Sequence, residues 1–305
     1  MLEPGASFSP IEWKLARLYR TLVFQKGVGR KVAIVVPFRD QHAAQKRAAH
    51  LAQFIPYMCS FMARALVPFH IYIVEQSDDG RKFNRGKLLN AGYEIARQAG
   101  SDGCSAFIFH DVDLLPDNDL LPHYRCGATS FATTPNHIAR VWSRYNANAD
   151  YVGGVTAFSA ECFERLNGFP NNFWGWGGED DEVRNRMRQA KMEFTWPKAG
   201  SLVDLENMTL QEKLEVLRAQ NTDAEGSDNH WRCMVKTDVL REHKATWQAN
   251  GLSSMRGEHA ASKGFELLKR TTLHASGFAS KVTVELRPNG DRWDDTTSWK
   301  DLGKS

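Results

Sequence analysis

Three apolar segments in the first half of the chain predict buried β-strands. The runs KVAIVVPF (31–38) and FHIYIVEQ (69–76) are rich in β-branched and aromatic residues, as in parallel strands that are covered on both faces. The segment SAFIFHDVDLLP (105–116) is apolar until it reaches two aspartates, and it predicts a third strand. The turn signal SDDG follows the second run, so we expect separate strands rather than one long element.

The segments between these strands predict helices. Residues 41–66 carry apolar side chains at helical intervals, although Pro56 is expected to kink or split this helix. KLLNAGYEIARQAG (87–100) predicts a second helix, closed by glycine. Alternating strands and helices indicate a parallel sheet, and such sheets bind ligands beyond the carboxyl ends of their strands. We therefore expect three polar segments to meet at that edge: Pro37–Asp40, Glu75–Asp79 and Asp111–Asp113.

The second half of the chain is less regular. Thr209 and Glu212 have the spacing of a capping box before a series of leucines, which predicts a helix over 209–220. The alternating run SKVTVEL (280–286) predicts a closing strand. The other expected elements are a strand at 151–159, a helix at 160–170 and a helix at 180–190 with an acidic first turn. The predicted fold class is α/β, with a mixed, mostly parallel central sheet flanked by helices.

Composition and charge favour a soluble globular protein. The 305 residues are 42% hydrophobic and 25% charged, with a formal net charge of +3 and no basic run typical of nucleic-acid binding. No apolar stretch approaches the ~18 residues that cross a bilayer, and the N-terminus lacks the pattern of a signal peptide. Cys104 and Cys126 can pair in an oxidising compartment or remain buried free thiols. We expect no nucleic-acid partner and no transmembrane segment in this chain.

The motif HDVDLLP (110–116) places two aspartates at the end of a predicted strand. Carboxylate oxygens on such a loop suit Mg²⁺ or Mn²⁺, with a diphosphate completing the coordination shell. The backbone usually turns at a strand end, so one aspartate can face a metal while the other holds a ribose or a loop amide. An isolated motif of this kind is more often an acidic loop without a ligand, so its meaning depends on the other motifs.

The segment FPNNFWGWGGEDDEVRNRM (169–187) combines glycines, tryptophans and acids. Its glycines let the backbone lie close to a ligand, and Trp174 and Trp176 offer flat faces of the kind that stack on sugar rings. Four acids (179–182) crowd one helix start, where repulsion should raise at least one carboxyl pKa unless a cation or a substrate relieves it. Such a carboxylate can accept a proton from a substrate hydroxyl. A glycine-closed turn before a capped helix explains the acids but not the tryptophans, which favours a functional role.

A third segment, FNRGKLLNAGY (83–93), places two basic residues beside an aromatic one. Arg85 and Lys87 precede or begin a predicted helix, which suits a nucleotide diphosphate. A solvated basic turn explains the same pattern, so this segment alone decides nothing.

Five motifs, in this order, are similar to signatures of one enzyme family: VPFRD, FNRGKLLNAGY, FHDVDLLP, YVGGVTAFS and NGFPNNFWGWGGEDDE. Over about residues 31–195 the chain resembles the β-1,4-galactosyltransferases, glycosyltransferase family 7, including the branch that galactosylates xylose on proteoglycan linkers. The resemblance implies a GT-A type fold and an inverting, metal-dependent transfer of galactose from UDP-galactose to a GlcNAc- or xylose-type sugar hydroxyl in β-1,4 linkage. The implied cofactor is Mn²⁺, with Mg²⁺ as the alternative, and the implied partners are the UDP-sugar and a glycan or glycoconjugate acceptor.

The domain organisation is expected to follow this family. We predict one GT-A catalytic domain over 31–286, divided into a nucleotide-binding half (31–130) and an acceptor half (131–286). A helical extension (1–30) precedes the domain, and a polar tail (287–305) follows it. The expected location is the cytoplasm, or the Golgi lumen if an N-terminal anchor precedes the given chain.

The resemblance also implies roles for single residues. Asp180 is implied as the catalytic base, and Glu179 as a second catalytic residue that binds the galactose. Asp113 is implied as the Mn²⁺ ligand, and Tyr151 as a residue that favours galactose over N-acetylgalactosamine. The residues implied in substrate binding are Pro37, Phe38, Arg39, Asp40, Phe83, Arg85, Asp111, Val112, Tyr151, Gly153, Gly154, Trp174, Trp176, Gly177, Gly178 and Asp181.

The chain departs from the family pattern at the metal site. Family members complete the metal shell with a histidine, often as HxH or MxxH, shortly after the acidic block, and no motif of that form follows here. His230, in SDNHWRCMVK (227–236), is the best candidate for the second ligand, although a lone histidine is more often polar surface. The alternatives are Met234, His243, His259 and His274.

Two other functions remain compatible with these motifs. An enzyme on the same scaffold can use another donor, such as UDP-N-acetylgalactosamine or UDP-glucose. A catalytically silent sugar- or nucleotide-binding protein is expected to lack an acid, whereas Asp113, Glu179 and Asp180 are all present. The preferred hypothesis is therefore a galactosyltransferase.

Overall fold

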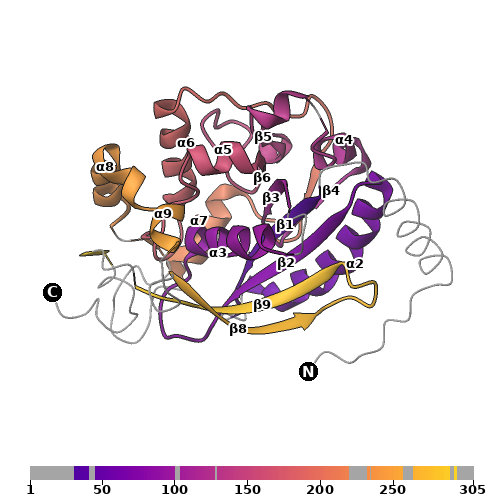
Figure 1. Cartoon of the computed structure of the whole chain (residues 1–305), viewed down its shortest axis with the longest axis horizontal. Helices are drawn as coiled ribbons and strands as arrows, with labels where there is room; N and C mark the ends of the chain where they lie inside the picture. The colour runs from indigo at the N-terminus through magenta and orange to yellow at the C-terminus, as the bar shows by residue number, and fades with distance from the viewer. Residues whose placement is uncertain are drawn as a thin grey trace.

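A seven-stranded sheet forms the centre of the molecule (Figure 1). The structure is a computed structural model that describes residues 31–40, 45–99, 104–127, 129–219, 232–233, 235–256, 264–288 and 292–293. The strand order is β5-β6-β3-β1-β2-β9-β8, and the central strands β3, β1, β2 and β9 run parallel. The sheet consists of β1 (Val32–Phe38), β2 (Phe69–Gln76), β3 (Ala106–His110), β5 (Asn136–His137), β6 (Val155–Ser159), β8 (Phe265–Thr272) and β9 (Ala279–Leu286). The predicted α/β class and mixed sheet are confirmed.

Strand β1 is buried along its whole length because helices cover both faces of the sheet. Alternate side chains of a strand point to opposite faces. Ile34 therefore packs in one apolar cluster with Phe54 of helix α2, whereas Val35 packs in the other with Leu88 of helix α3. The helices in the described residues are α2 (Arg47–Ala65), α3 (Arg85–Arg97), α4 (Leu121–Tyr124), α5 (Ala160–Arg165), α6 (Glu179–Gln189), α7 (Leu210–Ala219), α8 (Lys236–Thr246) and α9 (Leu252–Met255), together with short 3₁₀ turns.

Helix α2 continues through Pro56, so the helix is not split there. Nine of its side chains are buried, and this burial outweighs the backbone hydrogen bond that proline cannot donate. Helix α3 lies close against the other face of the sheet. A Cβ atom on Gly92 would be 2.3 Å from Cγ1 of Val35, so only glycine allows this approach.

The predicted strand 105–116 is wrong in one respect, because the chain turns in its middle. Strand β3 ends at His110, whose buried ring lies 2.7 Å from the hydroxyl of Tyr124. The amide of Asp111 donates to the carbonyl of Gly154 (2.9 Å), and the chain then enters β4 (Leu114–Pro116). This strand pairs with β7 (Leu202–Asp204) in a separate two-stranded sheet. The turn places both aspartates of the motif at the carboxyl edge of the central sheet.

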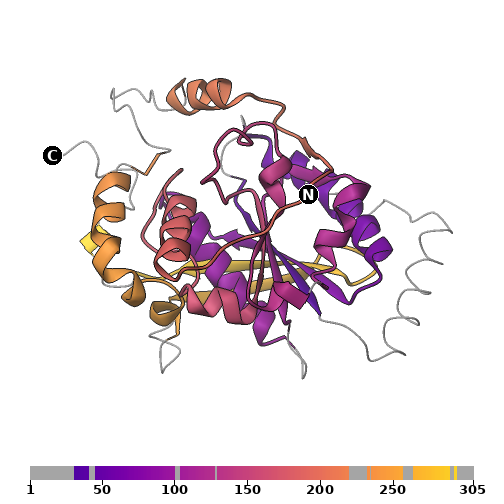
Figure 2. The same cartoon turned by 90° about the horizontal axis from the view of Figure 1, so that it is seen from above.

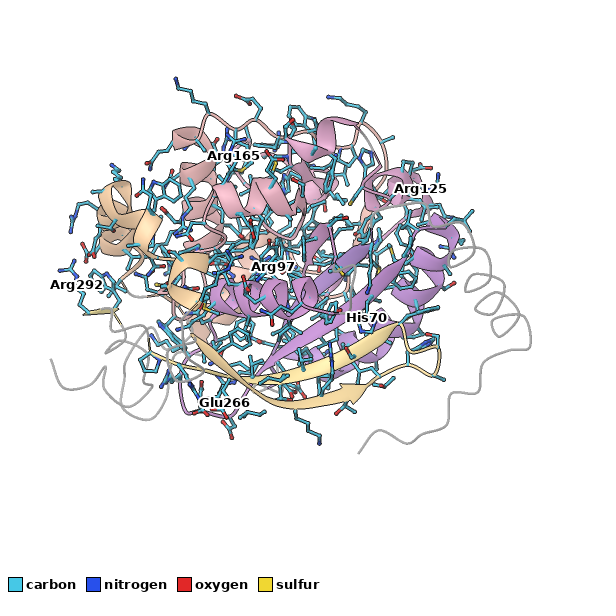
Figure 3. The ribbon with its side chains drawn as sticks, in the orientation of Figure 1. His70, Arg97, Arg125, Arg165, Glu266 and Arg292 are labelled. Carbon is cyan, nitrogen blue, oxygen red and sulfur yellow. The ribbon has the colours of Figure 1, made fainter. Side chains whose placement is uncertain are left out.

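Several elements of the second half agree with the sequence. The capping box of α7 is present: the amide of Thr209 donates to Glu212 (2.7 Å), and the amide of Glu212 donates to the hydroxyl of Thr209 (3.2 Å). The closing strand appears as β9, and His70 of β2, labelled in Figure 3, contacts Ser280 of β9 (2.8 Å). Strand β8 was not predicted, because its side chains are mostly exposed and show no alternation. Figure 2 shows α7 at the periphery, apart from the layers around the sheet.

The structure tests the predictions on the cysteines and on membrane helices, but it describes only part of the predicted domain organisation. All five cysteines are buried free thiols, so Cys104 and Cys126 do not pair. Within the described ranges, no helix has the length and apolar character needed to cross a membrane. The predicted extension (1–30) and most of the tail (287–305) lie outside the described residues, and the division of 31–286 into halves stays a prediction.

Candidate active site

A cleft of about 400 Å³ opens at the carboxyl edge of the central sheet. It brings together segments that are far apart in the sequence: the end of β1, the turn after β3, and the starts of α3 and α6. Of the residues that the sequence singled out, the cleft is lined by Pro37, Phe38, Arg39, Phe83, Arg85, Asp111, Val112, Asp113, Tyr151, Trp176, Gly177, Gly178, Glu179, Asp180 and Asp181. Asp113 and Asp180 therefore share one cleft, as expected.

Four of the predicted binding residues do not line the cleft. Asp40 is exposed and accepts a hydrogen bond from the amide of Ala48 (3.2 Å) at the start of α2. Trp174 is buried in the apolar cluster that contains Leu88 of α3, and Nζ of Lys87 lies 5.8 Å from its ring centre. Gly153 and Gly154 do not line the cleft, although Gly153 lies directly against the side chain of Asp180. His230 and the alternatives Met234 and His259 lie outside the described residues.

The other two histidines considered as metal ligands are also placed away from the cleft. His243 is buried beside Glu182, with 3.3 Å between Nδ1 and a carboxylate oxygen, and packs edge-on against Phe173. His274 lies in the turn between β8 and β9 and contacts the hydroxyl of Ser276. Neither lines the cleft, so neither is positioned to act with Asp113.

The glycines before α6 allow the acidic helix start to face the cleft. Gly175, Gly177 and Gly178 all have positive φ angles, between 96° and 108°. A Cβ atom on Gly178 would lie 2.3 Å from the ring of Phe173, and one on Gly175 would lie 2.6 Å from the backbone of Arg232. The chain can turn sharply into the helix only without these side chains.

Arg85 links the aspartate motif to the acidic helix start. The preceding Asn84 caps α3 by accepting from the amide of Lys87, which fixes where the arginine emerges. Arg85 donates to Asp111 (2.9 Å) and to Asp180 (2.8 Å), and its Nη1 lies 3.5 Å from Glu179. One guanidinium therefore holds three carboxylates together, although the like charges of the carboxylates repel one another.

Burial shifts the protonation of these carboxyl groups. Burial, with help from the charge of Asp180, raises the pKa of Glu179 to about 8, and Arg85 opposes this rise. Burial likewise raises the pKa of Asp111 to about 6, against the pull of Arg85. Burial also raises the pKa of Asp180, again opposed by Arg85. At neutral pH, Glu179 can therefore donate a hydrogen bond, whereas the raised pKa of Asp180 makes it a better proton acceptor than an ordinary aspartate.

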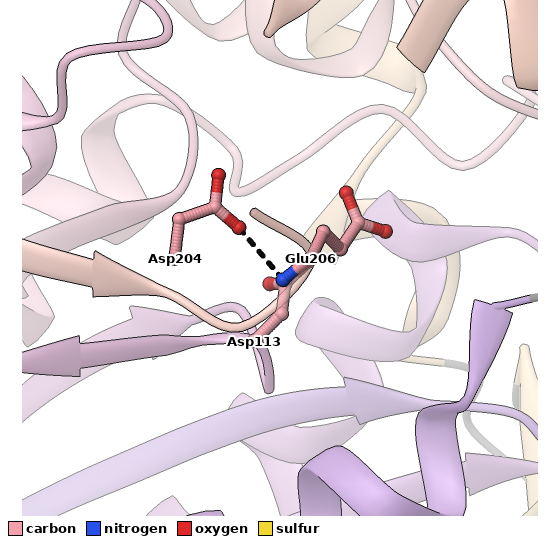
Figure 4. Close-up of side chains that lie close together, drawn as sticks. All are labelled: Asp113, Asp204 and Glu206. Atoms are coloured by element: carbon pink, nitrogen blue, oxygen red, sulfur yellow. Dashed lines mark hydrogen bonds between the residues drawn. The ribbon is translucent and has the colours of Figure 1, made fainter. Parts of the chain in front are cut away.

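A second group of charges surrounds Asp113. Oxygens of Asp113, Asp204 and Glu206 lie within 4.8 Å of one another (Figure 4). Arg47 donates to Asp113 and to Glu206, both at 2.7 Å, and Arg144 donates to Glu206 at 2.8 Å. We call the three carboxylates the acid triad. Oxygen donors of this kind fit a hard divalent cation.

Two members of the acid triad are held in their charged form, whereas burial raises the pKa of Asp204 against the pull of Arg144. Burial alone would raise the pKa of Asp113, but Arg47 and Lys213 outweigh burial and lower it to about 2. The pKa of Glu206 is also lowered: burial and the charge of Asp113 raise it, and the same two cations overcome both. Ligands for a metal ion must be deprotonated, and these two are.

Sequence reasoning missed part of the cleft wall. Tyr145 stacks on Tyr151 with 4.2 Å between ring centres, but no local pattern marked it. Glu206 follows Asp204 at the i, i+2 spacing of the DVD motif, so the segment DLE (204–206) was a readable signal that the search for histidine passed over. The additional cleft residues are Gln45, Arg47, Trp142, Arg144, Tyr145, Asn148, Glu206, Leu210, Lys213, Leu214 and Lys236.

Comparison with known proteins agrees with this geometry. A family model described as the N-terminal region of glycosyl transferase group 7 matches residues 27–127, and one described as the N-terminal domain of galactosyltransferase matches residues 133–212. β-1,4-Galactosyltransferase 4 of Rattus norvegicus is 36% identical over 228 residues, which are 74% of this chain and 58% of the relative. β-1,4-Galactosyltransferase 1 of Homo sapiens is 40% identical over 172 residues, 55% of this chain and 39% of the relative.

Solved structures give the same family. The catalytic domain of Drosophila β-1,4-galactosyltransferase 7 in complex with xylobiose is 28% identical, with a TM-score of 0.63 over 85% of this chain and 95% of that one. A mutant of that enzyme, in complex with manganese, UDP-Gal and xylobiose, is 27% identical with the same TM-score and coverage. The chain spans 58% of the length of the rat relative, and the solved Drosophila chain that it matches is a catalytic domain. The chain belongs to the β-1,4-galactosyltransferase family and has its GT-A type fold.

Proposed function

We propose that the protein transfers galactose from UDP-galactose to a sugar hydroxyl, with inversion and with a divalent cation. The main support is that one cleft contains both DVD aspartates and the acidic start of α6, and that Arg85 joins Asp111 to Asp180. Family membership and a neighbour in complex with manganese, UDP-Gal and xylobiose support the same chemistry.

The donor would lie along the carboxyl edge of β1. Phe38 and Phe83 line the cleft there and offer apolar faces to a base. Arg39 is held in place by the carbonyl of Arg81 (2.6 Å) and by Asp79 (3.3 Å), so its guanidinium is oriented before a ligand arrives. These contacts support a nucleotide subsite in this half of the cleft.

The metal ion would be held by Asp113 at the turn after β3. The donor set fits, since Asp113 is deprotonated and two further carboxylates lie within reach of it. A bound Mn²⁺ or Mg²⁺ supplies positive charge that stabilises the departing diphosphate.

The transfer needs one displacement and no covalent intermediate. The acceptor hydroxyl oxygen forms a bond to the anomeric carbon while the bond from that carbon to the UDP oxygen breaks, and Asp180 accepts the hydroxyl proton. Arg85 fixes the carboxylate of Asp180 at 2.8 Å, which positions it for this step. Glu179, whose pKa is about 8, would donate a hydrogen bond to a sugar oxygen.

The test is transfer from UDP-galactose, UDP-N-acetylgalactosamine and UDP-glucose to GlcNAc and xylose glycosides, with and without Mn²⁺. We expect galactose transfer that requires the metal. Asp180→Asn should lower kcat by roughly 10²–10⁴-fold and leave UDP-galactose binding within about threefold. The exposed Asp119→Asn is the matched control. Normal turnover by Asp180→Asn would refute the proposed base, and transfer from another donor would replace the proposed substrate.

A reducing compartment such as the cytoplasm is the proposed location. All five cysteines are free thiols, which suits reducing conditions. The alternative from the sequence is the Golgi lumen. Fluorescence microscopy of the natural full-length protein in its own cells would separate the two.

A further inference from the structure

The segment that follows the acidic helix returns to the metal side of the cleft in a fixed register. Strand β7 pairs with β4, so that Asp204 lies opposite Leu114. The amide of Leu205 then donates to the carbonyl of Asp113 at 2.8 Å. Backbone pairing therefore places residues 204–206 beside Asp113, independently of any attraction between their side chains.

The carboxylates of Asp204 and Glu206 lie close to the carboxylate of Asp113. Their oxygens lie within 4.8 Å of an oxygen of Asp113 and of one another (Figure 4). Asp204 accepts the amide of Glu206 at 3.0 Å and the indole N–H of Trp142 at 3.2 Å, which fixes its orientation. The side chains of Asp113 and Glu206 are only 7% and 4% exposed, and both residues line the cleft.

Three cations balance the acid triad. Arg47 bridges Asp113 and Glu206, Arg144 pairs with Glu206 and with Asp204 (2.6 Å), and Lys213 of α7 pairs with Glu206. Buried carboxylates need such counter-charge. Arg47 and Arg144 each contact two members of the triad, and Arg47 is the one that contacts Asp113, so it neutralises the charge that a divalent cation at Asp113 would neutralise.

A set of purely structural ion pairs is the competing explanation. Structural ion pairs explain why the carboxylates are paired with cations. They do not explain why the triad contains the aspartate that the family resemblance assigns to the metal. That resemblance also expects the remaining ligands shortly after the acidic block, often as HxH. Asp204 and Glu206 follow the block on the next strand and have the same i, i+2 spacing.

We propose that Asp113, Asp204 and Glu206 together form the metal centre, so that two carboxylates replace the histidine ligands expected from the family. This inference rests on the proposed metal-dependent function. An oxygen-only centre prefers hard cations such as Mg²⁺ and Mn²⁺, whereas imidazole nitrogen favours Zn²⁺ and related ions. The site should therefore accept Mg²⁺ as well as Mn²⁺, and it should prefer Zn²⁺ over Mg²⁺ less strongly than a centre with histidine ligands does.

The first test is direct binding of Mn²⁺ to the full chain, measured by electron paramagnetic resonance of the free ion, with Mg²⁺ and Zn²⁺ as competitors. Asp204→Asn and Glu206→Gln should each weaken Mn²⁺ binding by at least about tenfold, because affinity depends on the number of charged ligands. Asp150→Asn, which removes a carboxylate from a surface ion pair with Arg184, should stay within twofold. Unchanged Mn²⁺ affinity in both triad variants would overturn the proposal.

Two further variants keep the test decisive if a triad variant folds poorly. Arg47→Gln removes the bridging cation and should tighten Mn²⁺ binding by at least about threefold, since like charges repel. The double variant Asp204→His with Glu206→His restores the HxH pattern and should raise the preference for Zn²⁺ over Mg²⁺ by at least about tenfold. Weaker Mn²⁺ binding by Arg47→Gln, or an unchanged preference in the double variant, would count against the three-carboxylate centre.

The metal inference and the proposed function can fail separately. If the triad variants lose Mn²⁺ while the natural protein transfers no galactose to any acceptor, the centre stands and the function falls. If transfer requires Mn²⁺ but the triad variants bind it normally, the function stands and the assignment of Asp204 and Glu206 falls.

Discussion

Substituting Gly153 with alanine should displace the proposed base and leave the nucleotide-binding part of the cleft unchanged. The added Cβ atom would lie 2.0 Å from Oδ2 of Asp180 and 2.7 Å from the hydroxyl of Tyr151. The φ angle of Gly153 lies outside the left-handed region, so alanine causes no backbone strain there. The change therefore acts through the positions of two groups, mainly the carboxylate of Asp180 and secondly the hydroxyl of Tyr151.

The size of the effect follows from these distances. Cβ atoms are essentially never found closer than 3.0 Å to another heavy atom, so the carboxylate must withdraw by about 1 Å or more. A displacement of about 1 Å in a reacting group costs roughly 100-fold in rate. We expect kcat to fall by about that factor, which corresponds to about 2.7 kcal/mol in the activation barrier.

The assay is steady-state galactose transfer with Mn²⁺, together with calorimetric binding of UDP. The KM for UDP-galactose and the affinity for UDP should change by less than about threefold. Gly127→Ala is the matched control, because its nearest contact would be 4.0 Å away. In an Asp180→Asn background, Gly153→Ala should cost little more, since both changes remove the same function. A kcat within twofold of the natural protein would refute the placement of Asp180 as the base.

Three further predictions concern stability. Burial and the neighbouring Asp180 raise the pKa of Glu179 to about 8, above that of a carboxyl group in an unfolded chain. The free energy of unfolding should therefore fall as the pH rises from about 4.5 to 8. Urea unfolding of Glu179→Gln should show a flatter pH dependence. Gly92→Ala would push a Cβ atom to 2.3 Å from Val35, and thermal unfolding should report a loss of about 1–3 kcal/mol. Arg186→Met removes the guanidinium that lies 3.1 Å from the carboxylate of the buried Glu182. Urea unfolding should show a loss of about 3–5 kcal/mol in the free energy of unfolding. A loss below about 1 kcal/mol would contradict the importance of this ion pair.

Local patterns determined the elements whose signals lie within a few residues. The strands at 31–38 and 69–76 were predicted because a parallel strand covered on both faces is apolar throughout, and β1 is buried at every position. The capping box at Thr209 predicted the start of α7 because both of its hydrogen bonds join residues three positions apart. The ordered motifs likewise identified the family and the cleft edge at which its acids meet.

Tertiary structure decided what depends on contacts between distant segments. The sequence could not show that Gly153 leaves room for Asp180, since 27 positions separate them. Nor could it show that β7 returns beside Asp113 and brings Glu206 to the cleft, because that register is set by pairing with β4. Strand β8 escaped prediction because its exposed edge position imposes no hydrophobic pattern. The first two features depend on contacts between residues far apart in sequence, and the third lacks a buried face, so none of them leaves a local periodicity in the sequence.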